Sequence, residues 1–234
     1  MIPQTIHYCW FGKKPLPKLA LKCIGSWRKF FPEFEIKEWN EYNFDVNVIP
    51  YTAESYKKGK FAFVSDYARY WILYKFGGIY FDTDVEVIKS FNDIITAGPF
   101  LGIEKNRNTI SINPGLGMGA YIGMNFYKEM LTIFENWDPG DISFCPPPLL
   151  VNKTTESLEK IGLKKKDILQ NVDCIKIYPN DFFNPLDDYT GKIHLTHNTV
   201  SIHHYAKSWI DNYNPLRNKL THLYHRFQSK IQKS

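Results

Sequence analysis

The segment Gly77-Gly78-Ile79-Tyr80-Phe81-Asp82-Thr83-Asp84 carries the clearest structural signal in this sequence. The two glycines end an apolar helical pattern that begins at Val64, and the three residues after them predict a short buried strand. The strand leads directly into two carboxylates, which lie at i and i+2 and can converge on one site. An acidic pair alone is common on exposed turns, but the preceding glycines and apolar strand disfavour that alternative. Because hard divalent ions prefer oxygen ligands, the segment predicts a metal site.

The sequence before this segment alternates strand and helix patterns, which indicates an α/β domain. The predicted elements are a strand over 2–10, a loop over 11–17, a helix over 19–30, a strand over 33–39 and helices over 51–58 and 64–76. After the acidic pair, Val85, Val87 and Phe91 predict a further extended segment. Later predictions are a strand lining a cleft within 111–123, a rigid proline loop over 145–148 and a strand over 200–205.

The composition indicates one globular domain. The 234 residues are 44% hydrophobic and 23% charged, and no apolar run is long enough to span a bilayer. The N-terminal residues lack a signal-peptide pattern, and the four cysteines show no zinc-site spacing, so we expect reduced thiols in a cytoplasmic protein. The net charge of +5 suits an anionic partner without identifying one.

The C-terminal residues differ from the rest in composition. We predict a main domain over 1–212 and a basic amphipathic helix over 213–234, with leucines on one face and lysines and arginines around it. Two interpretations stay open: the helix packs on its own domain, or it lies on an anionic membrane as a peripheral contact at the inner face of the cell membrane.

Three further groups of residues can carry chemistry. Asp66 and Arg69 share one face of the predicted helix, either as a surface ion pair or as a buried pair that binds ligand. Trp10 ends the first strand, where it either belongs to the core or stacks on a nucleobase. His203 and His204 point to opposite faces of a strand, so one of them is expected to reach the metal, and Lys207, Ser208 and Trp209 can close over a diphosphate.

Taken together, these motifs resemble a bacterial member of glycosyltransferase family 32, the DXD sugar transferases, whose relatives include initiating mannosyltransferases, α-1,4-galactosyltransferases and capsular polysaccharide glycosyltransferases. The residues that carry the resemblance are F-A-F-V-S-D-Y-A-R and G-G-I-Y-F-D-T-D within 61–86, the opening I-P-Q-T-I-H-Y-C-W-F-G and the closing I-H-H-Y-A-K-S-W. The resemblance implies a GT-A fold, which is a Rossmann-like nucleotide-diphospho-sugar transferase fold. It also implies a Mn²⁺ or Mg²⁺ ion and transfer with retention at the anomeric carbon.

The resemblance also assigns roles to residues. It implies catalytic roles for Asp66, Arg69, Asp82 and Asp84, and metal binding by Asp82, Asp84 and His203 or His204, with His203 preferred. The implied donor-binding residues are Trp10, Ser65, Asp66, Arg69, Tyr80, Asp82, Lys207, Ser208 and Trp209. Asn113 and Glu104 are candidate acceptor contacts.

The predicted function is therefore a retaining glycosyltransferase that uses a nucleotide sugar, with a UDP-sugar favoured and GDP-mannose as the main rival. The pattern supplies no nucleophile, which favours same-face attack over a covalent intermediate. The expected acceptor is a growing glycan on a lipid carrier, in capsule, exopolysaccharide or lipopolysaccharide assembly, and no nucleic-acid partner is expected. The alternatives are a non-catalytic glycan- or nucleotide-binding protein on the same fold, and a metal-dependent phosphoesterase or nucleotidyltransferase, which usually needs more clustered carboxylates.

Overall fold

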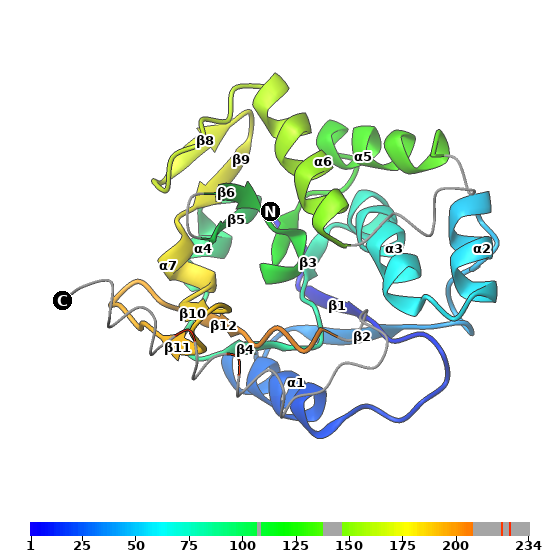
Figure 1. Ribbon diagram of the computed structural model, residues 1–234, viewed down its shortest axis with the longest axis horizontal. Coiled ribbons are helices and arrows are strands. Elements are labelled where there is room, and N and C mark those ends of the chain that lie inside the picture. Colours follow the sequence, from blue (N-terminus) through cyan, green and yellow to red (C-terminus); the bar gives the residue numbers. More distant parts are fainter. Residues whose placement is uncertain (107–108, 138–146, 208–220, 222–224, 226–234) are drawn as a thin grey trace.

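The computed structural model describes residues 1–106, 109–137 and 147–207, together with Thr221 and His225 (Figure 1). The helices are α1 (Lys18–Phe30), α2 (Pro50–Lys57), α3 (Phe61–Phe76), α4 (Asn92–Thr96), α5 (Asn125–Glu135), α6 (Pro147–Lys160), α7 (Asn180–Phe183) and the short 3-10 helix η1 (Pro114–Leu116). The strands are β1 (Thr5–Cys9), β2 (Glu35–Trp39), β3 (Gly78–Tyr80), β4 (Val85–Val87), β5 (Phe100–Asn106), β6 (Thr109–Ile112), β7 (Met118–Ala120), β8 (Gln170–Val172), β9 (Ile175–Tyr178), β10 (Leu186–Asp187), β11 (Lys192–Ile193) and β12 (Ser201–His203).

An eight-stranded mixed sheet forms the centre of the described chain. Its strand order is β2-β1-β3-β7-β5-β9-β8, and β6 pairs with β5. β1 pairs in parallel with β2 and β3, and β5 pairs in parallel with β9, whereas β7, β6 and β8 join antiparallel. β1, β2, β3, β5 and β9 therefore run in one direction, and the predicted α/β class is confirmed.

Helices cover both faces of this sheet. In Figure 1, α3, α5 and α6 lie together on one side and α1 lies on the other. Side chains along a strand point alternately to its two faces. In β3 and Phe81, which follows it, successive side chains therefore pack against the two helical layers in turn. Ile79 and Phe81 pack in the cluster that contains Trp27 of α1, whereas Tyr80 packs in the cluster that contains Tyr70 of α3. This alternation directs the side chains of the acidic pair, which follows Phe81, toward a cavity.

The turn between α3 and β3 needs both of its glycines. Gly77 and Gly78 have φ values of 61° and 92°, which side chains rarely tolerate. A Cβ at Gly78 would also lie 2.6 Å from the carbonyl oxygen of Thr5 and 3.0 Å from Nε2 of His7. The tight turn therefore sets β3 directly against β1 and fixes where the acidic pair begins.

Most predicted elements are present, with boundary shifts of one to three residues. The proline loop is wrong where it can be compared: Pro147 and Pro148 lie in the first turn of α6, where proline is tolerated because the first N–H groups of a helix need no partner within it. The late strand is shorter than predicted, since β12 ends at His203 and Tyr205 has a positive φ of 49°.

Some predictions concern residues outside the described part. These are Cys145 and Pro146 of the proline loop, Ser208 and Trp209, and the C-terminal helix together with its domain boundary. Of the remaining cysteines, Cys9 and Cys23 are buried free thiols and Cys174 is exposed. Among the described helices, none combines the length and the apolar character that a membrane crossing requires.

Candidate active site

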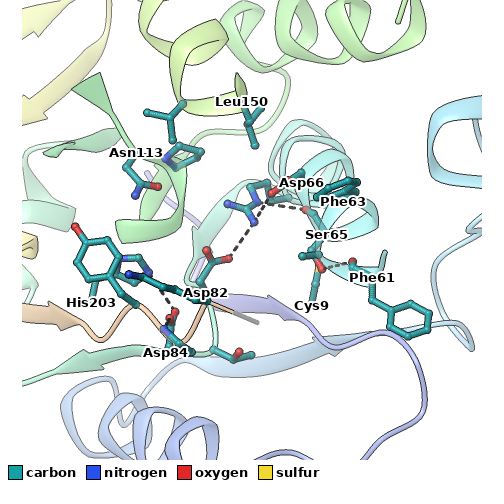
Figure 2. A pocket seen from close by; sticks show the side chains of 18 of the residues that line it. Cys9, Phe61, Phe63, Ser65, Asp66, Asp82, Asp84, Asn113, Leu150 and His203 are labelled. Atoms are coloured by element: carbon teal, nitrogen blue, oxygen red, sulfur yellow. Dashed lines mark hydrogen bonds and ion pairs between the residues drawn. The ribbon is translucent and has the colours of Figure 1, made fainter. Parts of the chain in front are cut away.

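A cavity of about 580 Å³ opens where several segments distant in the sequence meet. Its walls come from the end of β1, the start of α3, the loop after β3, the hairpin of β5 and β6, α6 and the residues after β12. Figure 2 shows Asp82 between Ser65 and Phe61 on one side and Asn113 and His203 on the other. The acidic pair predicted from the sequence therefore lies in the cavity and not on an exposed turn.

A cluster of two carboxylates and one imidazole lies at the floor of this cavity. β12 pairs antiparallel with β4 and places His203 opposite Val85, immediately after the acidic pair. Ligand atoms of Asp82, Asp84 and His203 all lie within 4.8 Å of one another, and Nε2 of His203 is 3.3 Å from Oδ1 of Asp84. Within the described residues, this is the one group of three such side chains with the spacing of a metal site.

The two most buried members of the cluster stabilise each other's charges. Burial alone would lower the pKa of His203, but the carboxylates of Asp84 and Asp82 raise this pKa to about 9. Burial alone would raise the pKa of Asp84, but His203 and the N–H of Ala206, which donates to Oδ2 at 2.7 Å, lower this pKa to about 2. Each of the two side chains thus favours the charged form of the other.

The two adjacent histidines have different surroundings. His203 lies against Asp84, whereas Nε2 of His204 is 2.8 Å from Oε2 of Glu86, on the side of β4 that faces α1. Lys22 of α1 contacts the same Glu86 oxygen at 2.6 Å. The strand alternation thus brings one histidine of the pair to the predicted metal site, and His204 belongs to a separate polar cluster.

The Asp66–Arg69 pair is buried, which excludes the interpretation as a surface ion pair. One guanidinium nitrogen of Arg69 lies 2.8 Å from Oδ1 of Asp66 and 3.1 Å from Oδ1 of Asp82. Side-chain exposure is 7% for Arg69 and 4% for Asp66. Burial raises the pKa of Asp66 to about 7 even though Arg69 opposes this shift. The arginine links the helix α3 to the acidic segment after β3.

Tyr80 contacts both Asp82 and Arg69. Its hydroxyl donates to Oδ1 of Asp82 at 3.1 Å, and the guanidinium of Arg69 lies 5.1 Å from the centre of its ring. The tyrosine is fully buried. Together with Asp82 and Arg69, it lines the cavity.

The other predicted donor-binding residues within the described part of the chain also line the cavity. Trp10 is half-buried, lines the cavity and also packs against the core cluster that contains Trp27, and its Nε1 donates to the carbonyl oxygen of Lys14 at 2.6 Å. Ser65 lines the cavity and donates to the carbonyl oxygen of Phe61 at 3.2 Å. Lys207 lines the cavity as well and forms an ion pair with Asp188 at 2.8 Å.

Several polar residues of the cavity were missed at the level of sequence. They are Asn106, Thr109, Ser111, Asn152, Asp188 and Tyr205. A weak signal did exist, because Thr109-Ile110-Ser111-Ile112 alternates polar and apolar residues and so predicts a strand with one polar face. The pattern does not show which strand pairs with this segment. It therefore does not show that the polar face lines a cavity.

Comparisons with known proteins agree with this geometry. Residues 17–101 match the model of the family described as glycosyltransferase sugar-binding region containing DXD motif. The matched residues make up less than half of the chain. They include the buried Asp66–Arg69 pair and both acidic residues of the Asp82–Asp84–His203 cluster, whereas His203 lies beyond them.

Two individual proteins extend the comparison. The chain is 32% identical over 121 residues to an uncharacterized glycosyltransferase of Acanthamoeba polyphaga mimivirus. The match covers 47% of each protein, so this chain spans about half the length of its curated relative. The solved structure of the PaToxG glycosyltransferase is similar with a TM-score of 0.53 and 17% identity, over 68% of this chain and 69% of that chain. The predicted GT-A-like fold is confirmed by this likeness.

Proposed function

We propose that this protein is a metal-dependent glycosyltransferase that transfers a sugar from a nucleotide-diphosphate donor to a glycan. The observation that carries the proposal is the cluster of Asp82, Asp84 and His203 in one cavity with the buried Asp66–Arg69 pair. The family match supports the same function, since residues 17–101 include four of these five side chains.

The cluster suits a divalent cation such as Mn²⁺ or Mg²⁺. It offers two carboxylates and one imidazole, whose Nε2 lies 3.3 Å from Oδ1 of Asp84. Such an ion, when bound, would offset the negative charge on a departing diphosphate. A phosphoesterase that uses two metals is less well supported, because the described residues contain this one cluster of three ligands.

Asp66 is suited to bind the donor sugar. Its Oδ1 contacts Arg69, but its Oδ2 is buried and has no hydrogen-bond partner. A buried acceptor that lacks a partner costs free energy, and a sugar hydroxyl that donates to it would remove this cost. Arg69, Ser65 and Tyr80 would then hold the donor side of the cavity in place through the contacts described above.

The remaining donor contacts follow from position. Trp10 presents its ring at the end of β1, the position at which α/β sheets bind nucleotides. Lys207 offers a cation to the phosphates once it leaves Asp188.

We further propose a UDP-sugar donor with retention at the anomeric carbon, with GDP-mannose as the rival, and a role in surface-polysaccharide assembly. Ser208 and Trp209 remain proposed phosphate contacts from the sequence alone.

Donor hydrolysis tests the proposal directly. Purified protein is incubated with UDP-glucose, UDP-galactose, UDP-N-acetylglucosamine and GDP-mannose, with and without Mn²⁺ or Mg²⁺. We expect hydrolysis of at least one donor that requires the metal. Asp84→Ala should slow this hydrolysis by about 100-fold or more, because it removes a charged ligand from the centre that stabilises the leaving group.

The matched control is Glu129→Gln, which removes a carboxylate from the exposed face of α5, away from the cavity. Its activity should equal that of the wild type. Full activity of Asp84→Ala would contradict the proposed role of the cluster. Mn²⁺-dependent binding of UDP in calorimetry, without any turnover, would instead favour a non-catalytic binding protein.

A further inference from the structure

The hairpin of β5 and β6 contributes cavity residues that are not among the proposed donor contacts. Glu104 pairs with Ser111 across the hairpin, and Asn106 pairs with Thr109. These four side chains share one face because side chains alternate along each strand, and all four line the cavity. Ile103 points to the opposite face and is buried in the core. The hairpin thus presents a polar face to the cavity and an apolar face to the core.

Glu104 is held in a fixed orientation on this face. Its Oε1 accepts a hydrogen bond from the hydroxyl of Tyr205 at 2.7 Å, and its Oε2 accepts one from Nδ2 of Asn113 at 2.9 Å. The amide of Asn113 is itself oriented, since its Oδ1 accepts from the N–H of Gly115 at 2.7 Å. A carboxylate offers about four lone-pair positions, so Glu104 keeps the capacity to accept further hydrogen bonds from a ligand.

This network lies next to the metal cluster. The ring of Tyr205 is 4.3 Å from the ring of His203, and a Cβ on Gly115 would overlap with Oδ2 of Asp82. In Figure 2, Asn113 lies on the same side of Asp82 as His203, opposite Ser65. A ligand that contacts Glu104 would therefore be close to a sugar held between Asp66 and the metal cluster, and not on the side of Trp10.

We propose that the polar face of the hairpin is the acceptor subsite and that Glu104 accepts a hydrogen bond from a hydroxyl group of an uncharged sugar acceptor; this rests on the proposed function. The amides of Asn106 and Asn113 and the hydroxyls of Thr109 and Ser111 can both donate to and accept from sugar hydroxyls. The negative charge of Glu104 repels a carboxylate or phosphate placed at the same position. The hairpin thus selects for a neutral, hydroxyl-rich end of a glycan.

The test separates acceptor binding from donor binding. Glu104→Gln keeps the size of the side chain and one carbonyl oxygen but removes the charge. The donor is the nucleotide sugar that the wild type hydrolyses fastest, and the acceptors are lactose, maltose, neutral methyl glycosides and the methyl glycoside of glucuronic acid. We expect the acceptor KM of Glu104→Gln to rise about tenfold, as for one lost hydrogen bond to a charged group. The Kd for UDP with Mn²⁺, from calorimetry, should stay within about twofold of the wild type.

Two further variants keep the test decisive. Asn106→Ala changes an exposed residue at the same face and should raise the acceptor KM by about two- to fivefold, as for one neutral hydrogen bond, even if Glu104→Gln folds poorly. Glu129→Gln is the control for a lost carboxylate and should leave both constants unchanged. Thermal melting of each variant checks that it is folded.

The outcomes distinguish this proposal from the one on which it rests. An unchanged acceptor KM in both hairpin variants would overturn the acceptor subsite, as would an equal weakening of UDP binding, which would assign Glu104 to the donor. Faster transfer to the glucuronide than to neutral sugars would overturn the proposed acceptor class. If the wild type neither bound UDP with Mn²⁺ nor hydrolysed any donor, the proposed function itself would fail before the variants were compared.

Discussion

At the scale of single residues, Gly115 leaves room for the carboxylate of Asp82 because it has no side chain. Its Cα faces Asp82, whose other carboxylate oxygen is held by Arg69 and Tyr80. An added Cβ would overlap with Oδ2 of Asp82. Because this atom is the end of a side chain, it can move away, and the cost falls on the metal cluster more than on the stability of the fold.

We therefore expect Gly115→Ala to weaken the binding of UDP with Mn²⁺ by about tenfold or more, since a small displacement of a preorganised ligand is costly. Calorimetry measures this change. The matched control is Gly25→Ala in α1, where an added Cβ meets nothing within 4 Å. This control should bind UDP normally and gain up to about 1 kcal/mol of stability from the higher helix propensity of alanine. Normal binding by Gly115→Ala would show that Asp82 tolerates the displacement.

His7 is a second residue whose neighbours fix its chemistry. The Nε1–H of Trp39 donates to its Nδ1 at 3.1 Å, so Nε2 carries the proton of the neutral ring and donates to the carbonyl oxygen of Gly77 at 3.1 Å. Burial lowers the pKa of His7 from 6.5 to about 4. Below pH 6.5 the unfolded chain therefore binds a proton that the folded protein does not, and acidification destabilises the fold.

We expect this residue to remove about 2 kcal/mol from the free energy of unfolding between pH 7 and pH 5. His7→Gln can mimic the hydrogen bonds of the neutral ring without titrating. Urea unfolding at both pH values should show a smaller loss for the variant than for the wild type by about this amount. An equal loss in the two proteins would mean that His7 takes up a proton in the folded state.

At the scale of elements, the α3–β3 turn combines two requirements that can be separated by experiment. Gly78 and Gly123 both have positive φ values, 92° and 74°. A Cβ at Gly78 meets the backbone of β1, whereas a Cβ at Gly123 meets nothing within 4 Å. Gly123 therefore reports the cost of the backbone conformation alone, and Gly78 adds the cost of steric overlap.

We expect Gly123→Ala to lower the free energy of unfolding by about 1 kcal/mol, and Gly78→Ala to lower it by about 2–4 kcal/mol. Urea unfolding at pH 7 gives both values. Equal losses would mean that β3 shifts away from β1 without cost. Such a shift should then also displace the acidic pair and reduce donor hydrolysis.

At the scale of the whole molecule, the sheet, which helices cover on both faces, brings together residues that are up to about 200 positions apart in the chain. Trp10 follows the second-to-edge strand β1, Asp82 follows β3, and His203 ends β12, yet all three line one cavity. The hairpin side comes from residues after the first hundred, whereas the donor side combines residues from the first hundred with His203 and Lys207 near the C-terminal end of the described chain.

The C-terminal residues carry a prediction at the same scale. We propose that 214–234 binds an anionic membrane surface through its basic and apolar residues. A protein that lacks these residues should lose most of its binding to vesicles of phosphatidylglycerol and phosphatidylcholine in a flotation assay. Binding to pure phosphatidylcholine vesicles is the control and should be weak for both proteins. Unchanged flotation would favour the alternative in which this segment packs on its own domain.

Local sequence patterns determined a large part of this protein. The glycine pair, the apolar strand and the acidic residues after it predicted the centre of the fold and two of the three side chains in the proposed metal cluster. These features depend on backbone conformation and on the alternation of side chains over a few residues, so they can be recognised in the sequence. The periodicity of α3 likewise placed Asp66 and Arg69 on one face.

Tertiary structure decided the rest. The pairing of β12 with β4 selects His203 over His204, and the pairing of β6 with β5 turns a weak polar alternation into one wall of the cavity. The burial that changes the Asp66–Arg69 pair from a surface contact into part of a site also depends on helices packed across the sheet. The physical reason is that strand pairing and burial involve residues far apart in the chain, whose contacts no local pattern encodes.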